Sequence, residues 1–536
     1  MVAITCLSLA LFAVVGQCLP SWKFQQSPIV KDSNYDESNV PRAPNTTKVA
    51  IIGSGITGAA AAFRLFEGFR LKFDQNVVVT IFERNPIIGG RITQAFAFND
   101  PSQPVDTCAA TFASQDTCIS QSATMVGLTA TPLLVTNQGG TGVWDGEKFV
   151  GFVEADDIRS PQRWSLFKKL KWLQAYGDAP FELDRKVAEV RQRFTQLLPP
   201  PIVQPGQPGQ PGQGNMPAKR NLSEEVEKAQ LTNAVKNTLC QFDDGREYID
   251  CFKPKEGAFV REIVNAGARE RYFEDIGDLK ALESLFGYED ENPVAIQGGN
   301  LRLVDRLIRL SGAQVRLNRV VEQVERLDDG KVRLKSFTIG GPGKIPEVAE
   351  DFDTVIIAAP LKLSNITFEP ELRPLASFAQ EYDDSFVTHF TTPSRLNGTF
   401  FNRKIGMPQN VLTSPLNGKD GPSPPFFSLT FIRTIQRAAN TRQQSLYKLV
   451  SRKMISDDEI GQYLDNDIGS PTDPLISWID RRPLPNSVPR AKSDQKLLED
   501  FEIMPGVIYA GAGEQIVATA EFGCRMGVNA AQMLLV

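Results

Sequence analysis

Short apolar runs alternate with a helical segment near the beginning of the chain. Residues 49–52 form an apolar run that ends in glycines, and residues 77–82 form a second run rich in β-branched side chains. Small and apolar side chains dominate residues 58–69 between them, which favours a helix packed closely against a sheet. A strand, a helix and a strand in this order predict parallel strands of a doubly wound sheet.

The same kind of pattern returns late in the chain. The sequence Gly298-Gly299-Asn300 opens a segment with helical periodicity that runs to about Leu310. The later elements are predicted as short strands at residues 314–317, 320–325, 353–358 and 507–510, followed by a helix of small residues at about 518–535.

The middle of the chain has a different texture. Helical patterns occur at residues 164–173, 187–198 and 223–290, so we predict a mainly helical inserted region over residues 131–290. A Pro/Gly-rich stretch at residues 199–217, with three Pro-Gly-Gln repeats, interrupts it and predicts an exposed flexible loop.

These patterns predict an α/β protein whose cofactor domain is assembled from both ends of the chain. The predicted division is residues 48–130, 291–375 and 501–536 for the cofactor domain, 131–290 for the inserted region, and 376–500 for a substrate domain.

The first residues predict a targeting signal. Residues 1–19 contain an apolar run, residues 7–15, of the length of a signal-peptide core, and small residues follow it. Residues 20–47 are polar and proline-containing, which predicts a loose leader. No later stretch is apolar enough to predict a transmembrane segment in the mature chain.

Composition excludes several classes of function. The chain has 58 basic and 63 acidic residues and a formal charge of −5, with no basic stripe that would indicate a nucleic-acid partner. His389 is the single histidine, so zinc or copper sites built from several histidines are excluded, and we predict no metal site. The residues around His389 predict a strand, in which it has a structural role.

Cysteines and glycosylation sequons point to the secretory pathway. After loss of the signal, Cys108 lies close in sequence to Cys118, and Cys240 to Cys251, so two local disulfides are predicted in an oxidising compartment. Cys524 remains and is predicted to be a buried thiol. Four N-x-S/T sequons predict a secreted, lysosomal or vacuolar glycoprotein: Asn45, Asn221, Asn365 and Asn397.

The first chemical motif is a glycine turn between a predicted strand and a predicted helix. Gly53 permits the tight turn, Gly55 lets a pyrophosphate approach the backbone, and Gly58 lets the helix pack against the strand. The helix N-terminus then offers unpaired N–H groups to the phosphates. Glu83 ends the next strand, where an acid binds a ribose hydroxyl, so the motif predicts a dinucleotide cofactor without a 2′-phosphate.

Two further motifs narrow the cofactor to FAD. Gly89, Gly90 and Arg91 follow soon after Glu83, a placement typical of FAD enzymes, and Arg91 is a candidate partner of the pyrophosphate. Near the end of the chain, Gly513 and Glu514 precede the closing helix, whose N-terminus can stabilise negative charge on a reduced flavin. Glu514 is a candidate hydrogen-bond partner of the ribityl chain.

Several segments together resemble the prenylcysteine oxidase (prenylcysteine lyase) family of FAD enzymes. The resemblance is carried by residues 49–55, 82–84, 89–91, 295–300, 358–361 and 364–368, and near the C-terminus by Gly513-Glu514, Glu521 and residues 529–531. It implies a glutathione-reductase-like FAD-binding Rossmann domain with an inserted α+β substrate domain.

The resemblance also implies an activity. Members of this family are secreted or lysosomal thioether oxidases that cleave farnesyl- or geranylgeranylcysteine with molecular oxygen. The products are cysteine, a prenyl aldehyde and hydrogen peroxide. An apolar channel for the prenyl chain is expected, and the inserted region supplies candidate residues for it at Trp164, Leu166, Phe167, Leu170 and Trp172. The motifs assign no catalytic residue.

Two segments depart from the family pattern. Residues 108–113, Cys-Ala-Ala-Thr-Phe-Ala, replace a glycine pair and a histidine-containing stretch, and residues 271–274 replace an Asn-Tyr-Gly-Gln stretch. Both are expected near the substrate. Two alternatives therefore stay open: an oxidase of the same fold that acts on another small molecule, such as a secondary metabolite or an amine, and a non-catalytic lumenal flavin-binding glycoprotein.

Overall fold

The computed structural model describes most of the chain from residue 46 onwards. The described residues are 46–72, 76–113, 117–132, 140–153, 166–185, 187–188, 254–279, 283, 294–340, 348–372, 380–403, 405–415, 423–437, 441–465, 474–490, 501–515 and 517–535. The predicted signal, leader, Pro/Gly-rich loop and Cys240–Cys251 pair lie outside these residues, as do Asn45 and Asn221.

A six-stranded sheet brings together the beginning, the middle and the end of the chain. Its order is β20 (Glu502–Met504), β21 (Val507–Tyr509), β13 (Thr354–Ile357), β1 (Thr46–Ile52), β2 (Asn76–Phe82) and β9 (Gln314–Arg316). All neighbours pair in parallel except β20 and β21. The predicted parallel sheet, built from both ends of the chain, is therefore confirmed.

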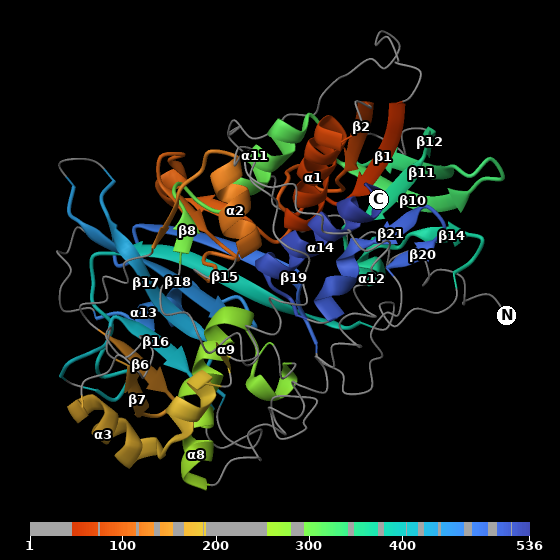
Figure 1. The fold of residues 1–536 in the computed structure, drawn as a ribbon. Coiled ribbons are helices and arrows are strands. Elements are labelled where there is room, and N and C mark those ends of the chain that lie inside the picture. Colours follow the sequence, from red (N-terminus) through yellow and green to blue (C-terminus); the bar gives the residue numbers. More distant parts are fainter. Residues whose placement is uncertain are drawn as a thin grey trace, which may run out of the picture.

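Helices cover one face of this sheet, and a second sheet packs on the other. The helices are α1 (Ile56–Lys72), α2 (Thr117–Met125), α11 (Leu301–Ser311) and α14 (Ala520–Leu534) (Figure 1). Successive side chains of β1 point to opposite faces. Val49 and Ile51 therefore pack with the helices, whereas Ala50 and Ile52 pack against the four-stranded sheet. That sheet has the order β12 (Val348–Phe352), β11 (Val332–Thr338), β10 (Arg319–Arg326) and β14 (Thr367–Glu369).

A seven-stranded sheet forms the other half of the molecule. Its order is β19 (Trp478–Pro489), β15 (Tyr382–Thr392), β18 (Gln444–Ser451), β17 (Ser428–Ile435), β16 (Asn410–Thr413), β6 (Thr141–Trp144) and β7 (Phe149–Val153). The sequence reading placed residues 141–153 at the start of a mainly helical region. They instead form two strands, because Trp144 joins an aromatic core with Phe401 and Phe426 beneath the sheet.

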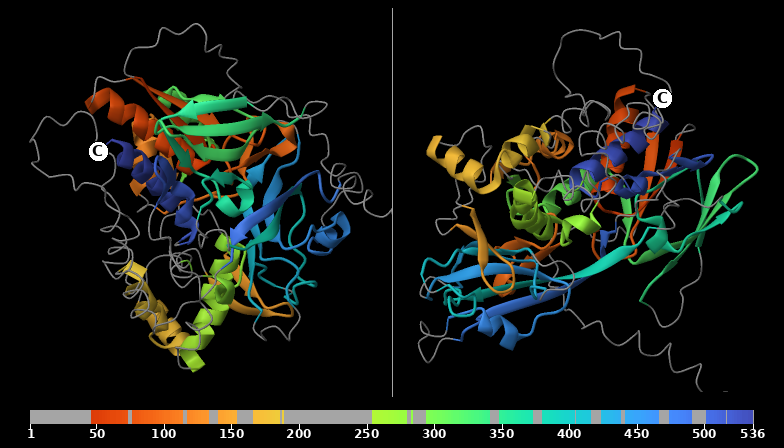
Figure 2. Two further views of the ribbon diagram at one scale, coloured as in Figure 1. Left: turned by 90° about the vertical axis from the view of Figure 1, so that its right-hand side faces the viewer. Right: turned by 90° about the horizontal axis from the view of Figure 1, so that it is seen from below.

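Helices of the inserted region flank this sheet. They are α3 (Leu166–Tyr176), α8 (Pro254–Phe259), the π-helical turn η4 (Val260–Val264) and α9 (Asn265–Tyr272). Trp172 and Tyr176 of α3 pack against Phe259 of α8. Figure 2 shows these helices beside the seven-stranded sheet.

Short elements complete the described part of the structure. They are β3 (Gln94–Phe96), η2 (Ala97–Asn99), β4 (Pro104–Asp106), β5 (Ala130–Pro132), β8 (Val294–Ile296), α12 (Leu361–Ser364), α13 (Asp457–Gln462), η5 (Ile276–Asp278) and η9 (Ala510–Gln515). Among the described helices, none combines the length and the apolar character that a bilayer span requires.

Candidate active site

The glycine turn after β1 has the geometry that its spacing predicts. Gly53 has a φ of +107°, which favours glycine, and its N–H donates to Phe82 O at 2.8 Å. A Cβ on Gly58 would lie 2.0 Å from Gly53 O, so only glycine lets α1 start this close to β1. A Cβ on Gly55 would meet nothing nearer than 3.9 Å. The turn therefore packs closely between β1 and α1 at Gly58, whereas space is left beside Gly55, where a pyrophosphate would approach α1.

Glu83 lies at the end of β2, beside this turn, and is buried. Its Oε2 accepts hydrogen bonds from Ser54 N at 3.0 Å and Ser54 Oγ at 2.7 Å. Its Oε1 accepts from Asn85 N and Asn85 Nδ2, each at 2.8 Å. The two backbone donors hold the carboxylate in place, and the two side-chain donors can turn away in favour of ribose hydroxyls.

Arg91 and Glu514, assigned separately from the sequence, contact each other. Gly90, just before Arg91, has a φ of +59°. Arg91 Nη1 donates to Glu514 Oε1 at 2.7 Å, and the phenol of Tyr382 donates to Glu514 Oε2 at 3.2 Å. Burial lowers the pKa of Arg91, but the Glu514 carboxylate outweighs it and the net pKa is raised. The three side chains join the Gly-Gly-Arg turn, the C-terminal turn η9 and the first residue of β15.

The closing helix approaches α1 through small residues. A Cβ on Gly527 would lie 2.1 Å from Thr57 O, and one on Gly513 would meet Met526 and Phe522 within 3.0 Å. Thr519 caps the helix by accepting from Phe522 N at 3.2 Å. The predicted second helix N-terminus is therefore present at Ala520, shortly after Gly513 in the sequence.

Glu521 in the first turn of α14 has a contact that the sequence does not suggest. It accepts from Cys118 N at 2.9 Å and from Ile119 N at 3.0 Å, and so satisfies free N–H groups at the start of α2. Arg525, one turn later, donates to the same carboxylate at 2.5 Å.

The predicted Cys108–Cys118 disulfide is wrong. Cys118 is bonded to Cys524, 406 residues away, and Cys108 is a buried free thiol. Glu521 anchors the start of α2 against the start of α14, which places Cys118 beside Cys524. Closeness in sequence therefore misled the pairing, and Cys524, predicted to be a thiol, is a disulfide partner.

Residues 105–113 lie between the cofactor half and the seven-stranded sheet. Asp106 accepts from Gln94 Nε2 at 3.0 Å and from Asn300 N at 3.3 Å, which holds the turn that precedes α11. Burial raises the pKa of Asp106 to about 6. Ala109 has a φ of +48°, a conformation that favours glycine. The chain thus takes the path of a glycine at a position where the sequence has alanine.

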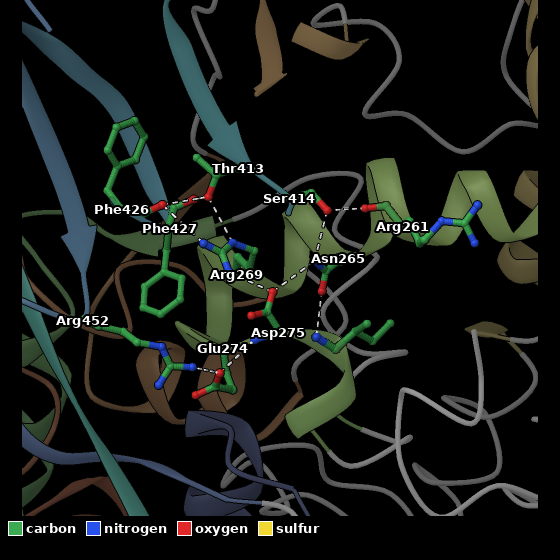
Figure 3. Close-up of polar contacts among 11 residues, drawn as sticks. Arg261, Asn265, Arg269, Glu274, Asp275, Thr413, Ser414, Phe426, Phe427 and Arg452 are labelled. Carbon is green, nitrogen blue, oxygen red and sulfur yellow. Dashed lines mark hydrogen bonds and ion pairs between the residues drawn. The ribbon is translucent and has the colours of Figure 1, made fainter. Parts of the chain in front are cut away.

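A polar cluster holds α9 against the sheet (Figure 3). Arg269, 2% exposed, donates to Asp275 Oδ1 at 2.8 Å and to Thr413 Oγ1 at 3.0 Å. Its guanidinium carbon lies 4.6 Å from the centroid of the Phe427 ring. Glu274 forms an ion pair with Arg452, and burial raises the pKa of Glu274 to about 7 despite that cation. These contacts fix the 271–274 segment that was predicted to lie near the substrate.

Phe273 of that segment packs against the seven-stranded sheet. It ends α9 with a φ of +60° and packs against the buried side chains of Val387, Phe427 and Val450. Lys448 Nζ lies 5.5 Å from the centroid of its ring. The segment therefore meets the face of the seven-stranded sheet on which β18 presents Lys448.

The predicted apolar channel residues do not lie together. Leu166 and Leu170 of α3 are 76% and 56% exposed, so they line no interior channel, and Trp172 is buried in the contact with α8. The side chains of Trp164 and Phe167 lie outside the described part of the structure. An 11-residue amphipathic helix with its buried stripe toward α8 explains why apolar residues on its other side are exposed.

The remaining sequence predictions have a definite place. His389 lies in β15 as predicted, fully buried, with Nδ1 3.9 Å from Asp480. Asn365 is exposed at the end of α12. Asn397 is partly buried, and its Nδ2 donates to Gln462 O at 3.1 Å.

Comparison with known families decides the relationship of the chain. A family model described as prenylcysteine lyase matches residues 221–536, more than half of the chain. The chain belongs to the prenylcysteine lyase family. A model of an NAD(P)-binding Rossmann-like domain matches residues 51–123, which contain the glycine turn, Glu83 and Arg91.

Curated relatives of the prenylcysteine lyase family align over most of their length. The chain is 25% identical to "Prenylcysteine oxidase 1" of Bos taurus over 450 residues, covering 78% of this chain and 79% of the relative. It is 22% identical to "Farnesylcysteine lyase" of Arabidopsis thaliana over 527 residues, covering 95% and 92%.

Solved structures show the same fold. A putrescine oxidase superposes with a TM-score of 0.56 at 13% identity, covering 91% of this chain and 99% of that chain. The cyclohexylamine oxidase of Brevibacterium oxydans superposes with a TM-score of 0.52 at 16% identity, covering 91% and 98%. The predicted α/β flavoprotein fold is confirmed, and this prenylcysteine lyase family member is an FAD-dependent oxidoreductase.

The residues present fit FAD. Gly55 is open where the pyrophosphate would bind, Glu83 is fixed at the ribose position, and α1 begins beneath them. Arg91, Glu514 and Tyr382 surround the next part of the site. Sequence reasoning missed Tyr382, Arg269 and Lys448. Of these, Lys448 has a signal: a single charge inside the apolar strand Leu446-Tyr447-Lys448-Leu449-Val450.

Proposed function

We propose that this protein is an FAD-dependent thioether oxidase that cleaves prenylcysteine with molecular oxygen. The observation that carries the proposal is the prenylcysteine lyase match over residues 221–536. That match covers strands β15 to β19 of the seven-stranded sheet and α9, as well as the C-terminal cofactor residues. The substrate-facing half, and not the nucleotide motif alone, is therefore what this chain shares with the family.

The proposed reaction converts a prenyl thioether, oxygen and water into a prenyl aldehyde, a thiol and hydrogen peroxide. Bound FAD supplies an acceptor for the hydride that leaves the allylic carbon beside sulfur. Water adds to that carbon, which loses a proton, and the carbon–sulfur bond then breaks to give the aldehyde and cysteine. Two electrons pass from the carbon to oxygen, and the two protons that complete hydrogen peroxide balance the equation.

This chemistry needs position and a dry site more than a strong acid or base. Sulfur and the allyl group delocalise the positive charge that develops at the reacting carbon, so orientation and exclusion of water carry much of the rate. The chain fits this requirement. Around Lys448, the sheet face toward the cofactor half carries buried apolar side chains, Leu446 and Val450, and Phe273 packs over it.

In this proposal, polar residues of the chain position the cofactor and do not act as acid or base. Arg91 and Tyr382 fix Glu514, so this carboxylate keeps a defined position toward the ribityl part of the cofactor. The phenol of Tyr382 stays protonated, because burial and the Glu514 carboxylate both raise its pKa. The backbone of Gly55 and the first N–H groups of α1 hold the pyrophosphate.

We also propose that the protein works in the secretory pathway, as a secreted or a lysosomal or vacuolar glycoprotein with its signal removed. The Cys118–Cys524 disulfide supports an oxidising compartment. The exposed side chain of Asn365 supports glycosylation at that sequon. Secreted protein should shift on a gel after endoglycosidase treatment, and its N-terminus should begin near residue 20. An unshifted protein that begins at Met1 would contradict this assignment.

The activity is tested with purified protein, S-farnesyl-L-cysteine and S-geranylgeranyl-L-cysteine. We expect peroxide and free thiol in equal amounts, and bleaching of the flavin absorbance when substrate is added without oxygen. Putrescine and a primary alcohol serve as controls. If neither thioether reacts while the amine or the alcohol bleaches the flavin, the chain oxidises another class of substrate. If nothing bleaches the bound flavin, the protein is not an oxidase of any of these substrates.

A further inference from the structure

Strand β18 presents two faces with different characters. Tyr447 and Leu449 point into the aromatic core beneath the seven-stranded sheet. Leu446 and Val450 point to the opposite face, as Lys448 between them must, because side chains alternate along a strand. Lys448 is therefore a single charged side chain in the middle of the sheet face that meets the cofactor half.

Apolar clusters lie on both sides of Lys448 along the strand. Leu446 packs with Ala97 and Val105, which belong to the cofactor half. Val450 packs with Phe427 and with Phe273 at the end of α9. Lys448 thus lies where three parts of the molecule meet: the sheet, residues 94–108, and the segment that follows α9.

A polar row crosses the sheet at the same level. Thr430 of β17 pairs with Lys448, Lys448 with His389 of β15, and His389 with Asp480 of β19. Directly paired residues of antiparallel strands project to the same face. His389 is fully buried, and neither of its ring nitrogens has a hydrogen-bond partner in the structure. Two adjacent strands therefore present nitrogen-bearing side chains on this face, and the Asp480 carboxylate lies 3.9 Å from His389 Nδ1.

The charge of Lys448 has no direct counter-ion. Within the described residues, no hydrogen bond or ion pair joins Lys448 Nζ, which lies 5.5 Å from the centroid of the Phe273 ring. Asp106, Cys108 and Glu270 lie near enough to act on its charge. Asp106, however, is already bound to Gln94 and Asn300. Burial lowers the pKa of Lys448, which is the cost of a cation without a partner.

We propose that Lys448 binds the carboxylate of the substrate, at the interface between the seven-stranded sheet and residues 94–108. The proposal rests on the proposed function, because S-prenylcysteine carries a free carboxylate on an otherwise apolar molecule. An anionic ligand group would satisfy an interior ammonium through charge-assisted hydrogen bonds. An ester lacks this negative charge, so Lys448 determines specificity for acids over esters.

The test compares S-farnesyl-L-cysteine with its methyl ester in wild-type protein, Lys448→Met and Lys448→Arg. Lys448→Met should raise KM for the acid by about 10- to 100-fold, the effect of one lost charged hydrogen bond. KM for the ester should change by less than about twofold, and Lys448→Arg should restore part of the preference for the acid. Lys453→Met, the same change at an exposed lysine nearby, is the matched control.

A binding experiment keeps the proposal testable if turnover fails. S-dodecyl-L-cysteine has no allylic carbon beside sulfur, so its binding can be followed by the visible spectrum of the flavin without reaction. Wild-type protein should bind this acid more tightly than its methyl ester, and Lys448→Met should remove the difference. If the wild-type protein does not turn over prenylcysteine but still prefers the acid, the proposed function is contradicted and the role of Lys448 in binding a carboxylate is supported.

Two outcomes would overturn the proposal that Lys448 binds the substrate carboxylate. One is an equal loss for acid and ester in Lys448→Met with normal flavin content, which would place Lys448 toward the cofactor or the reacting carbon. The other is an unchanged preference for the acid in Lys448→Met. A variant that purifies without flavin is replaced in both assays by Lys448→Gln, for which the same acid-to-ester comparison applies.

Discussion

The cofactor half and the substrate-facing half of this protein are specified in different ways. In the cofactor half, the glycine turn joins residues that are near in sequence and at a fixed spacing, as Gly53 and Gly58 show. In the other half, Arg269 bonds Thr413 from 144 residues away, and Lys448 meets Phe273 from a separate element. A short motif can describe the first kind of contact, whereas only the folded chain shows the second.

Gly55→Glu should have the largest effect, and it should break the cofactor half alone. A side chain at Gly55 meets no protein atom closer than 3.9 Å, so the fold should survive. The new carboxylate would occupy the place of the pyrophosphate and repel it, weakening FAD binding by about 100-fold or more. Flavin absorbance of the purified protein measures the loss.

Gly58→Ala is the matched comparison for that change. Its Cβ would lie 2.0 Å from Gly53 O, so it should lower the unfolding temperature as well as the flavin content. The interpretation of the turn would fail if Gly55→Glu retained full flavin, or if it unfolded as readily as Gly58→Ala.

Arg269→Leu should break the other half while leaving cofactor binding intact. It removes a buried guanidinium that bonds Asp275 and Thr413, and should lower the unfolding free energy by roughly 3 kcal/mol. Arg309→Leu, on the surface of α11 where Arg309 pairs with Asp305, should change it by no more than about 0.5 kcal/mol. Denaturant unfolding followed by tryptophan fluorescence compares the two.

The Arg269→Leu variant also sharpens the division between the halves. Its flavin content per folded molecule should equal that of the wild type, because none of its partners belongs to the glycine turn or to η9. If the Arg269→Leu variant had a lower flavin content per folded molecule than the wild type, cofactor binding would depend on the α9 contacts, and the two halves would not be independent.

Glu274→Gln should have the smallest effect, visible as a change in pH dependence. Burial raises the pKa of Glu274 from its ordinary value of 4.5 to about 7, so the folded state holds its proton more tightly than the unfolded state. This group therefore stabilises the fold fully below about pH 4.5 and less as the pH rises through about 7. Glutamine does not titrate, so the variant lacks this loss.

The measurement is the difference in unfolding free energy between the two proteins at pH 4.5 and at pH 8. Between pH 4.5 and pH 8, the unfolding free energy of the variant should rise relative to that of the wild type by about 1–3 kcal/mol. Asp106 and Glu67, whose pKa values burial raises to about 6 and about 7, titrate in the same window and cancel because both proteins contain them. Parallel pH curves would refute a proton held by Glu274.

Five strands of the six-stranded sheet could be predicted, because short apolar stretches next to glycines or an apolar helix mark them, whereas β20 was missed. Gly53, Glu83 and the Gly89–Arg91 turn were found for the same reason: their chemistry requires fixed residue types at fixed spacings. Arg91 and Glu514 were each assigned from the sequence, but their ion pair was not, since it joins residues 423 positions apart.

The substrate-facing half could be predicted only in outline. Strands β6 and β7 were missed because they depend on an aromatic core that Phe401 and Phe426 contribute from distant parts of the chain, which residues 141–153 alone do not indicate. Sequence proximity favoured Cys108 as the partner of Cys118, although the start of α14 is the neighbour that matters. Lys448 carried a readable signal, a charge within an apolar strand, which becomes meaningful only when its face is known.

The bond between Cys118 and Cys524 gives the molecule the covalent topology of a closed loop. All of the seven-stranded sheet, the α9 cluster and most of the six-stranded sheet lie between the two joined positions. A protease that cuts any one of the 406 peptide bonds between the two cysteines would leave a single covalent molecule. Such a nicked protein would run as one band on a non-reducing gel and as two after reduction, with both ends of the FAD site still attached to each other.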